Sequence, residues 1–137
     1  MPSLRRLLRL TPSEVALLAS AWSGLAAARL SLSWRGTAPL DAPPARPSPS
    51  GDPSVTDQGE VRRVTWAVRH AARLVPAATC LTQAIAARRL LARRGIRSDL
   101  RIGVARESDG KMRAHAWLEC DGVTILGQAD REYAQLR

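Results

Sequence analysis

Hydrophobic residues near the start of the chain recur at the spacing of a helix. Val15, Leu18, Trp22 and Leu25 are three or four positions apart, so they fall on one stripe of a helix. We therefore expect residues 1–36 to form an N-terminal helical segment, as one helix or as two short ones, that docks on the rest of the protein.

The next stretch, residues 37–59, shows no such periodicity. It holds six prolines among Ala, Ser and Gly. A composition of this kind buries too little apolar surface to build a core. We expect these residues to form a linker or a long exposed connection.

Residues 60–137 carry the pattern of a folded domain. Apolar residues at helical spacing, with arginines between them, predict one helix from Glu60 to about Leu74 and a second from Cys80 to Gly95. The proline that follows the first helix and the glycine at the end of the second are typical helix terminators.

The period of the hydrophobic positions then changes from about 3.6 to 2. Alternation over Leu100–Val104 and over Met112–Cys120 predicts two strands. Asp121-Gly122 is a strong hairpin signal that leads into a third strand, Val123–Leu126. Helices followed by an antiparallel meander predict an α+β fold.

The N-terminus superficially resembles a signal peptide. Arg5, Arg6 and Arg9 precede an uncharged stretch of 14 residues, Val15–Ala28. The intervening Thr11–Glu14, however, has the form of a capping box with Pro at the first helical position, which is typical of a folded helix start. A membrane span also needs about 20 apolar residues. We therefore expect a cytoplasmic protein without a membrane anchor.

The charge of the chain is strongly basic. The formal net charge of +9 comes from arginine, because Lys111 is the one lysine. Such a charge suits nucleic acid, anionic lipid or an acidic peptide alike. The sequence contains neither a basic and aromatic pattern of the RRM type nor zinc-finger spacing, so we do not expect nucleic acid as a partner. A non-catalytic basic adaptor remains an alternative.

Cys80 has the position of a nucleophile. A thiol at a helix N-terminus is close to unpaired backbone N–H groups and to the positive end of the helix dipole, which favours the thiolate. The same N–H groups can hold the oxyanion of a tetrahedral intermediate. Cys120, the second cysteine, falls on the apolar face of its strand and is better interpreted as a core residue, and we expect both thiols to be free.

A nucleophilic cysteine needs a histidine as its proton acceptor. The chain offers His70 and His115. His115 lies on a strand that should pack against the Cys80 helix, whereas His70 sits among apolar residues of the preceding helix, where a partly buried structural role fits better. The pair to favour is Cys80 with His115, although the spacing alone also fits a small helix-start residue and an ordinary strand residue. No close CxxC or HxxxH pair anchors a metal site, and none is expected.

Several segments together resemble the lasso peptide leader peptidases, which belong to the transglutaminase-like superfamily. The resemblance extends to the N-terminal helix and covers the chain apart from the proline-rich stretch. The segments that carry it are Pro76–Leu81, Arg93–Ile96, Leu100–Val104, Leu10–Glu14 and, above all, Ala-His-Ala-Trp-Leu-Glu-Cys-Asp-Gly at Ala114–Gly122.

The resemblance implies a small transglutaminase-like cysteine peptidase that needs no cofactor. It would cleave a ribosomally made precursor between leader and core, with Cys80 as nucleophile and His115 as general base and acid. It also implies two partners besides the precursor: a separate small protein that binds the leader, and a separate cyclase that closes the ring. An acyl transferase or amidase with the same Cys-His chemistry remains an alternative, because the nucleophile does not determine whether water or an amine resolves the acyl-enzyme.

The third catalytic residue departs from the family pattern. The family carries an aspartate about twelve residues after the histidine, and here that place falls near Gly127. If Asp121-Gly122 forms a two-residue turn, counting outward along the hairpin sets Gln128 opposite His115, where its amide could orient the imidazole. The competing carboxylates are those of Asp130, Asp121 and Glu119.

Overall fold

The computed structural model describes residues 11–35, 55–76, 78–106, 108–127 and 134–135 of the chain. Within these residues, three helices precede four strands, which confirms the predicted α+β fold. In chain order the elements are α2 (Pro12–Arg35), α3 (Val55–Ala72), α4 (Cys80–Arg93), β1 (Asp99–Arg106), β2 (Met112–Cys120), β3 (Val123–Leu126) and β4 (Ala134–Gln135).

Helix α2 begins at the predicted capping box. The backbone N–H of Thr11 donates to the Glu14 carboxylate at 2.7 Å, and the Thr11 hydroxyl accepts from the N–H of Glu14 at 3.3 Å. These hydrogen bonds from Thr11 hold the pKa of Glu14 below its usual value. The helix is continuous through Gly24. A Cβ added at Gly24 would lie 3.8 Å from the Cβ of Ala86 in α4, which is an ordinary van der Waals contact.

Helix α2 is apolar on both sides. One side is buried against α3 and α4 through Leu17, Ala21 and Leu25, while Trp22 and Trp34 are among the exposed large side chains. By length and composition, α2 could cross a membrane, so the expectation that this stretch is too short for a span is wrong. Core helices and signal sequences meet the same criteria, and the buried side shows α2 as part of the core.

Helix α3 starts earlier than the sequence pattern predicted. It begins at Val55 rather than Glu60, so the last five residues of the predicted linker are helical. Asp57 lies in the first turn, where a carboxylate interacts favourably with the helix dipole. Residues 37–54 of the predicted linker lie outside the described residues.

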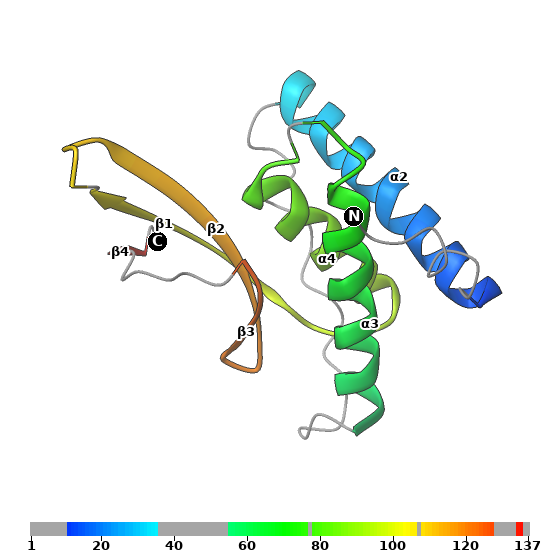
Figure 1. Ribbon diagram of the computed structural model, residues 1–137. Coiled ribbons are helices and arrows are strands. Elements are labelled where there is room, and N and C mark those ends of the chain that lie inside the picture. Colours follow the sequence, from blue (N-terminus) through cyan, green and yellow to red (C-terminus); the bar gives the residue numbers. More distant parts are fainter. Residues whose placement is uncertain (1–10, 36–54, 77, 107, 128–133, 136–137) are drawn as a thin grey trace.

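The strands form one antiparallel sheet with the order β3-β2-β1-β4. The three predicted strands are present, and Asp121 and Gly122, both at positive φ, form the expected turn between β2 and β3. β4 was not predicted, because two residues carry no periodicity. Figure 1 shows the helices together beside one end of the sheet, with the far end of the β1–β2 hairpin extending away from them.

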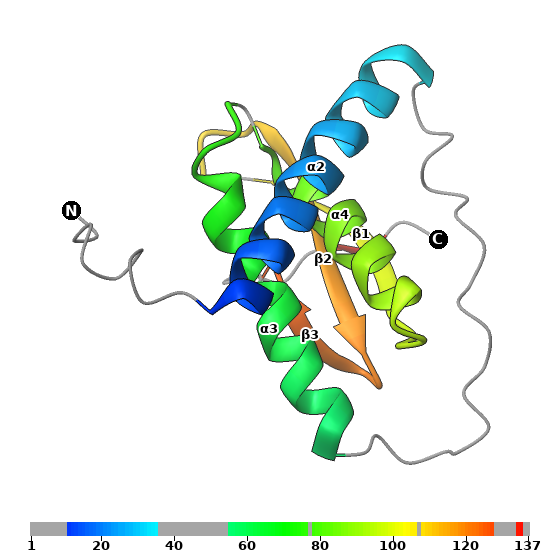
Figure 2. The same ribbon diagram turned by 90° about the vertical axis from the view of Figure 1, so that its right-hand side faces the viewer.

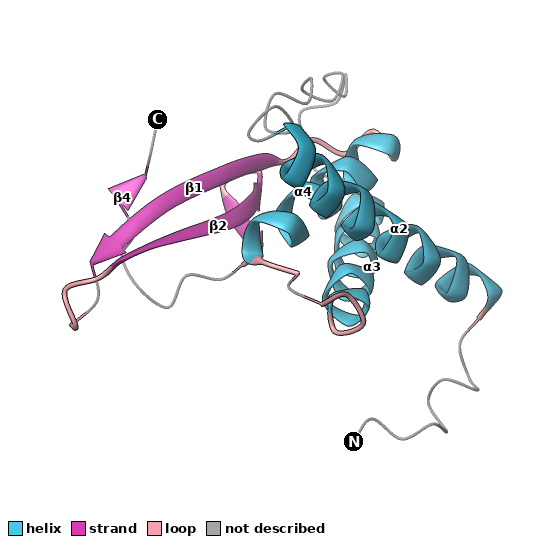
Figure 3. Cartoon of the chain, turned by 90° about the horizontal axis from the view of Figure 1, so that it is seen from above, coloured by secondary structure: helices cyan, strands magenta, loops and turns pink. Residues whose placement is uncertain are grey.

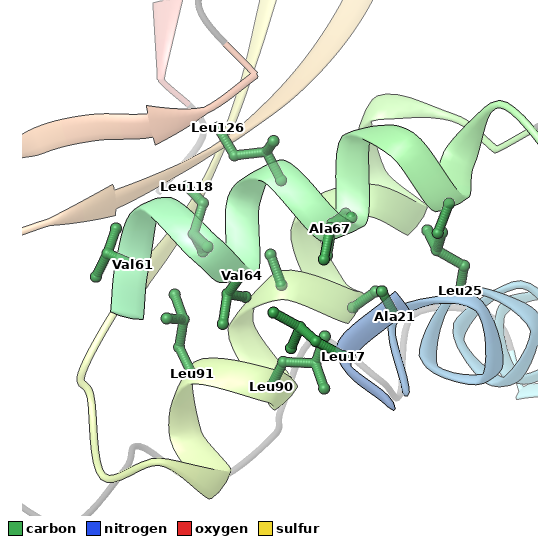
Figure 4. Close-up of a cluster of buried hydrophobic side chains, with 14 of the residues drawn as sticks. Leu17, Ala21, Leu25, Val61, Val64, Ala67, Leu90, Leu91, Leu118 and Leu126 are labelled. Carbon is green, nitrogen blue, oxygen red and sulfur yellow. The ribbon is translucent and has the colours of Figure 1, made fainter. Parts of the chain in front are cut away.

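The core lies between the three helices and the near part of the sheet. Helix α4 occupies its centre, with α2, α3 and β2 all packed against it, and Figure 2 shows α2 and α3 crossing in front of the sheet. Leu118 of β2 and Leu126 of β3 add the sheet's contribution to this cluster (Figure 4). Most of the other members are Ala, Val and Leu, as expected from a chain without Phe.

Two leucines of α2 give a matched test of its docking. Leu25 is fully buried and Leu30 is 58% exposed. We predict that Leu25→Ala lowers the free energy of unfolding by about 2–5 kcal/mol, because it removes a buried side chain and leaves a cavity. Leu30→Ala makes the same change of helix propensity and should cost at most about 0.5 kcal/mol. Urea unfolding followed by circular dichroism measures both, and equal small losses would contradict the docking of α2.

Candidate functional site

Cys80 is the first residue of α4, and Thr79 is its N-cap. The Thr79 hydroxyl accepts from the N–H of Thr82 at 3.3 Å, and the Thr79 carbonyl accepts from the N–H of Gln83 at 3.0 Å. The N–H groups of Cys80 and Leu81 belong to the first turn, which has no intrahelical acceptors. The half-buried thiol therefore lies at a helix end whose backbone donors suit an oxyanion.

The start of α4 is held from both sides. The side chain of Gln83 donates back to the carbonyl of Ala78 at 3.1 Å, and the hydroxyls of Thr79 and Thr82 are 3.0 Å apart. Thr82 is buried, and the next turn of α4 is buried too. These contacts fix the position of the Cys80 thiol on a helix rather than on a loop.

His115 is half-buried in the middle of β2, and one of its contacts indicates the tautomer of the neutral ring. Its Nε2 lies 2.8 Å from the carbonyl oxygen of Gly127. A carbonyl only accepts hydrogen bonds, so Nε2 carries the hydrogen of the neutral imidazole and Nδ1 keeps the lone pair. This tautomer makes Nδ1 the atom that can take a proton from a nucleophile.

Trp117 and Glu119 follow His115 on the same side of β2. The rings of His115 and Trp117 are stacked with centroids 6.2 Å apart. The indole Nε1 of Trp117 donates to Glu119 Oε1 at 2.8 Å, and Arg101 Nε donates to Glu119 Oε2 at 3.2 Å. Both oxygens of Glu119 are thus engaged by Trp117 and Arg101, so this competing carboxylate serves to brace the strand beside the histidine.

The other predicted third residues do not reach His115 or fall outside the described residues. Asp121 lies in the turn, six residues along from His115, which corresponds to about 20 Å at roughly 3.3 Å per residue. Its carboxylate approaches the thiol of Cys120 instead. Gln128 and Asp130 lie outside the described part of the chain.

The register of the β2–β3 hairpin differs from the predicted count. The predicted pairing holds next to the turn, but Leu118 then pairs with Leu126 because the register shifts between Leu118 and Glu119. The uniform count that set Gln128 opposite His115 therefore fails at Leu118, which it would have paired with Ile125. The one-residue shift is typical of a β-bulge, which changes the side to which every later residue points.

Cys80 and His115 lie on two elements that pack against each other, α4 and β2. The thiol of Cys120, at the end of β2, donates to the carbonyl of Arg97, in the segment between α4 and β1, at 3.2 Å. Figure 3 shows the first turn of α4 next to β2.

Alternation puts His115 and Trp117 on the side of β2 opposite to Ala116 and Leu118. Trp117 is nevertheless 6% exposed, while Ala116 is 2% exposed. Both sides of the strand are therefore covered immediately after the histidine.

The remaining cysteine and histidine have structural contacts. Cys120 packs against the core as predicted, and burial, followed by the nearby Asp121 carboxylate, raises the pKa of its thiol. His70 is exposed rather than partly buried as expected, and its Nδ1 lies 2.8 Å from the carbonyl of Trp66, on whose ring it packs. Among the described residues, no group of three His, Cys, Asp or Glu could hold a metal ion.

Comparison with known proteins identifies one family. The transglutaminase-like superfamily matches residues 24–137, a range that contains both Cys80 and His115. No match was found among curated proteins or among solved structures. The matched range includes α3, α4 and the whole sheet, together with the second half of α2.

The raised pKa of Cys120 gives a test of the two thiols. We predict that Cys120, studied alone in a Cys80→Ser protein, reacts with iodoacetamide at a higher pH than glutathione does, because a raised pKa leaves less thiolate at any given pH. Mass spectrometry of the labelled protein gives the rate at each pH. Asp121→Asn in the same background should move the profile to lower pH, since it removes a neighbouring negative charge. A pH dependence of the labelling rate equal to that of glutathione would contradict the raised pKa of Cys120.

Proposed function

The chain belongs to the transglutaminase-like superfamily, and from this premise we propose that it is a cysteine peptidase that removes the leader from a ribosomally made lasso precursor peptide. Cys80 is the nucleophile and His115 the general base and acid. The observation that carries the proposal is the half-buried thiol of Cys80 in the first turn of α4, where backbone N–H groups can bind an oxyanion. Helix α4 packs against β2, the strand that carries His115.

The first half of the reaction forms an acyl-enzyme. Sγ of Cys80 attacks the scissile carbonyl carbon, and its proton passes to Nδ1 of His115. The backbone N–H groups of Cys80 and Leu81 stabilise the oxyanion of the tetrahedral intermediate. When the C–N bond breaks, the imidazolium returns its proton to the leaving amine.

The second half releases the leader. His115 takes a proton from water, which attacks the thioester, and the resulting intermediate expels Cys80 and yields a free carboxylate. An amine in place of water would give a transferase from the same acyl-enzyme. Mass spectrometry of the products separates the two: hydrolysis yields two peptides, whereas a joined product would establish transfer.

The proposed partners follow from the resemblance to the leader peptidases. They are the precursor peptide, a separate leader-binding recognition protein and a lasso cyclase, in the cytoplasm and without a cofactor. Cleavage assayed with and without the recognition protein tests the second of these. A non-catalytic basic adaptor would instead show no cleavage and a steep salt dependence of DNA binding.

Removal of the proposed nucleophile gives the first test of catalysis. We predict that Cys80→Ala and Cys80→Ser abolish precursor cleavage and leave the circular dichroism spectrum unchanged, because the thiolate is lost and the buried part of α4 is not. Cys120→Ala is the control, and we expect it to cost about 1 kcal/mol of stability with cleavage largely retained. The reverse pattern would refute the role of Cys80.

Removal of the proposed base should be equally severe. We predict that His115→Ala abolishes cleavage as Cys80→Ala does, since the thiol then lacks its proton acceptor and the leaving amine its donor. His70→Ala is the matched control, because His70 is exposed on α3. Substantial cleavage by His115→Ala together with loss of cleavage by His70→Ala would move the catalytic role to His70.

A further inference from the structure

We propose that the exposed side of helix α2 binds to the surface of a bilayer that contains anionic phospholipid. The helix lies in the plane of the headgroups and does not cross the membrane. This inference is independent of the proposed peptidase function, because it uses neither Cys80 nor His115.

Helix α2 carries two apolar stripes, and one of them is buried. The buried stripe faces α3 and α4 and consists of Leu17, Ala21, Leu25 and Ala28. The second stripe, which we call the outer stripe, also repeats every three or four residues, and the helical pitch places it on the opposite side. It consists of Val15, Ala19, Trp22, Ala26, Leu30 and Trp34, of which all but the half-buried Ala26 are exposed. A continuous apolar surface of this kind marks an interaction site.

The outer stripe faces away from the rest of the protein. Figures 1 and 3 show α2 on the side of the helices that is turned away from the sheet. From Val15 to Trp34 the stripe extends over about 30 Å of the helix. A flat partner such as a bilayer can therefore contact the whole stripe and leave the sheet in water.

The residue types of the outer stripe are those of an interfacial helix. Trp22 and Trp34 have large apolar rings with one polar N–H, and tryptophan is enriched where proteins meet lipid headgroups. Between Val15 and Trp34 the sequence has one charged residue, Arg29, which is exposed. The stripe thus offers apolar side chains to the acyl boundary, as amphipathic helices bound in the interface do.

The charges around the outer stripe favour an anionic surface. Arg29 lies on α2 itself, and Arg63 of α3 donates to the hydroxyl of Ser13, in the first turn of α2, at 3.4 Å. Arg63 and Arg94 share one carboxylate, that of Glu60, so this group keeps a positive charge. Cytoplasmic leaflets with anionic lipid attract such arginines, which agrees with the proposed location and with the net charge of +9.

Two other arrangements of the outer stripe fit less well. A helix that crossed the membrane would withdraw Leu17 and Leu25 from the core, where both are buried. A second copy of the chain would bring together two proteins that each carry a charge of +9, and a large net charge disfavours self-association. The bilayer surface covers the outer stripe and leaves the core intact.

Binding to lipid vesicles of defined composition tests the proposal. We expect the full-length protein to sediment with vesicles of phosphatidylcholine and phosphatidylglycerol far more than with vesicles of phosphatidylcholine alone. Added salt should weaken the binding, because it screens the arginines from the headgroups. Equal binding to both kinds of vesicle, or binding to neither, would overturn the proposal, and this comparison needs no variant to fold.

Tryptophan quenching measures the depth of the helix. Trp22 lies near the middle of α2, and in a Trp34→Leu protein it is the one tryptophan of that helix. We expect phospholipids with bromine near the headgroup to quench it more than phospholipids with bromine near the bilayer centre. The opposite order would show a spanning helix and would overturn the proposal.

Matched substitutions assign the binding to the outer stripe. We expect Leu30→Ala to weaken vesicle binding about 10-fold, because less apolar surface leaves water, whereas Met112→Ala, at the exposed far end of the sheet, leaves it unchanged. Arg29→Gln should weaken binding to the anionic vesicles about 5-fold, with Arg106→Gln on β1 as its control. Equal effects of each substitution and its control would place the binding elsewhere and overturn the proposal.

Sedimentation velocity of the protein without lipid tests the second copy. We expect a monomer at all concentrations. A dimer that Leu30→Ala dissociates would assign the outer stripe to a second copy of the chain and overturn the proposal. The substituted side chains of α2 are exposed, so the circular dichroism spectra of these variants should match that of the unsubstituted protein.

Discussion

The close packing of α4 against α2, α3 and β2 is the constraint on which the rest of the structure depends. Helices approach one another closely only where side chains are small, and α4 buries Ala84, Ala86 and Ala87, with Gly24 of α2 opposite Ala86. Because α4 is enclosed in this way, its first residue occupies a fixed place relative to the sheet. Cys80 is therefore positioned by the hydrophobic core, and a side chain on a rigid element keeps its geometry better than one on a loop.

The same packing makes helix α2 part of the same folded unit as α3, α4 and the sheet. A segment of fewer than about 80 residues rarely builds a sufficient core alone, and the residues from Glu60 onward form such a segment. Leu17, Ala21 and Leu25 of α2 complete the cluster around α4. The predicted division at residues 37–59 thus separates two segments of the sequence that share one core.

Local signals in the sequence predicted the elements well, and tertiary packing explains the differences. The start of α4 at Cys80 and the Asp-Gly turn follow from a capping threonine and from residues that tolerate positive φ, which act over a few positions. The register of β3 does not follow from such local signals, because both Ile125 and Leu126 are apolar and either could face the core. Leu126 pairs with Leu118 and is buried with it, and no residue within the hairpin predicts this pairing.

The position twelve residues after His115 illustrates the same limit of local signals. The sequence has a glycine there, where the family pattern expects an aspartate. Gly127 lies at positive φ, and a Cβ at this position would be 2.6 Å from the carbonyl oxygen of Ala116. The close approach of the chain to β2 therefore requires glycine at this position, and it brings the carbonyl of Gly127 to 2.8 Å from Nε2 of His115. This contact depends on the packing of two strands and has no counterpart in the local sequence pattern.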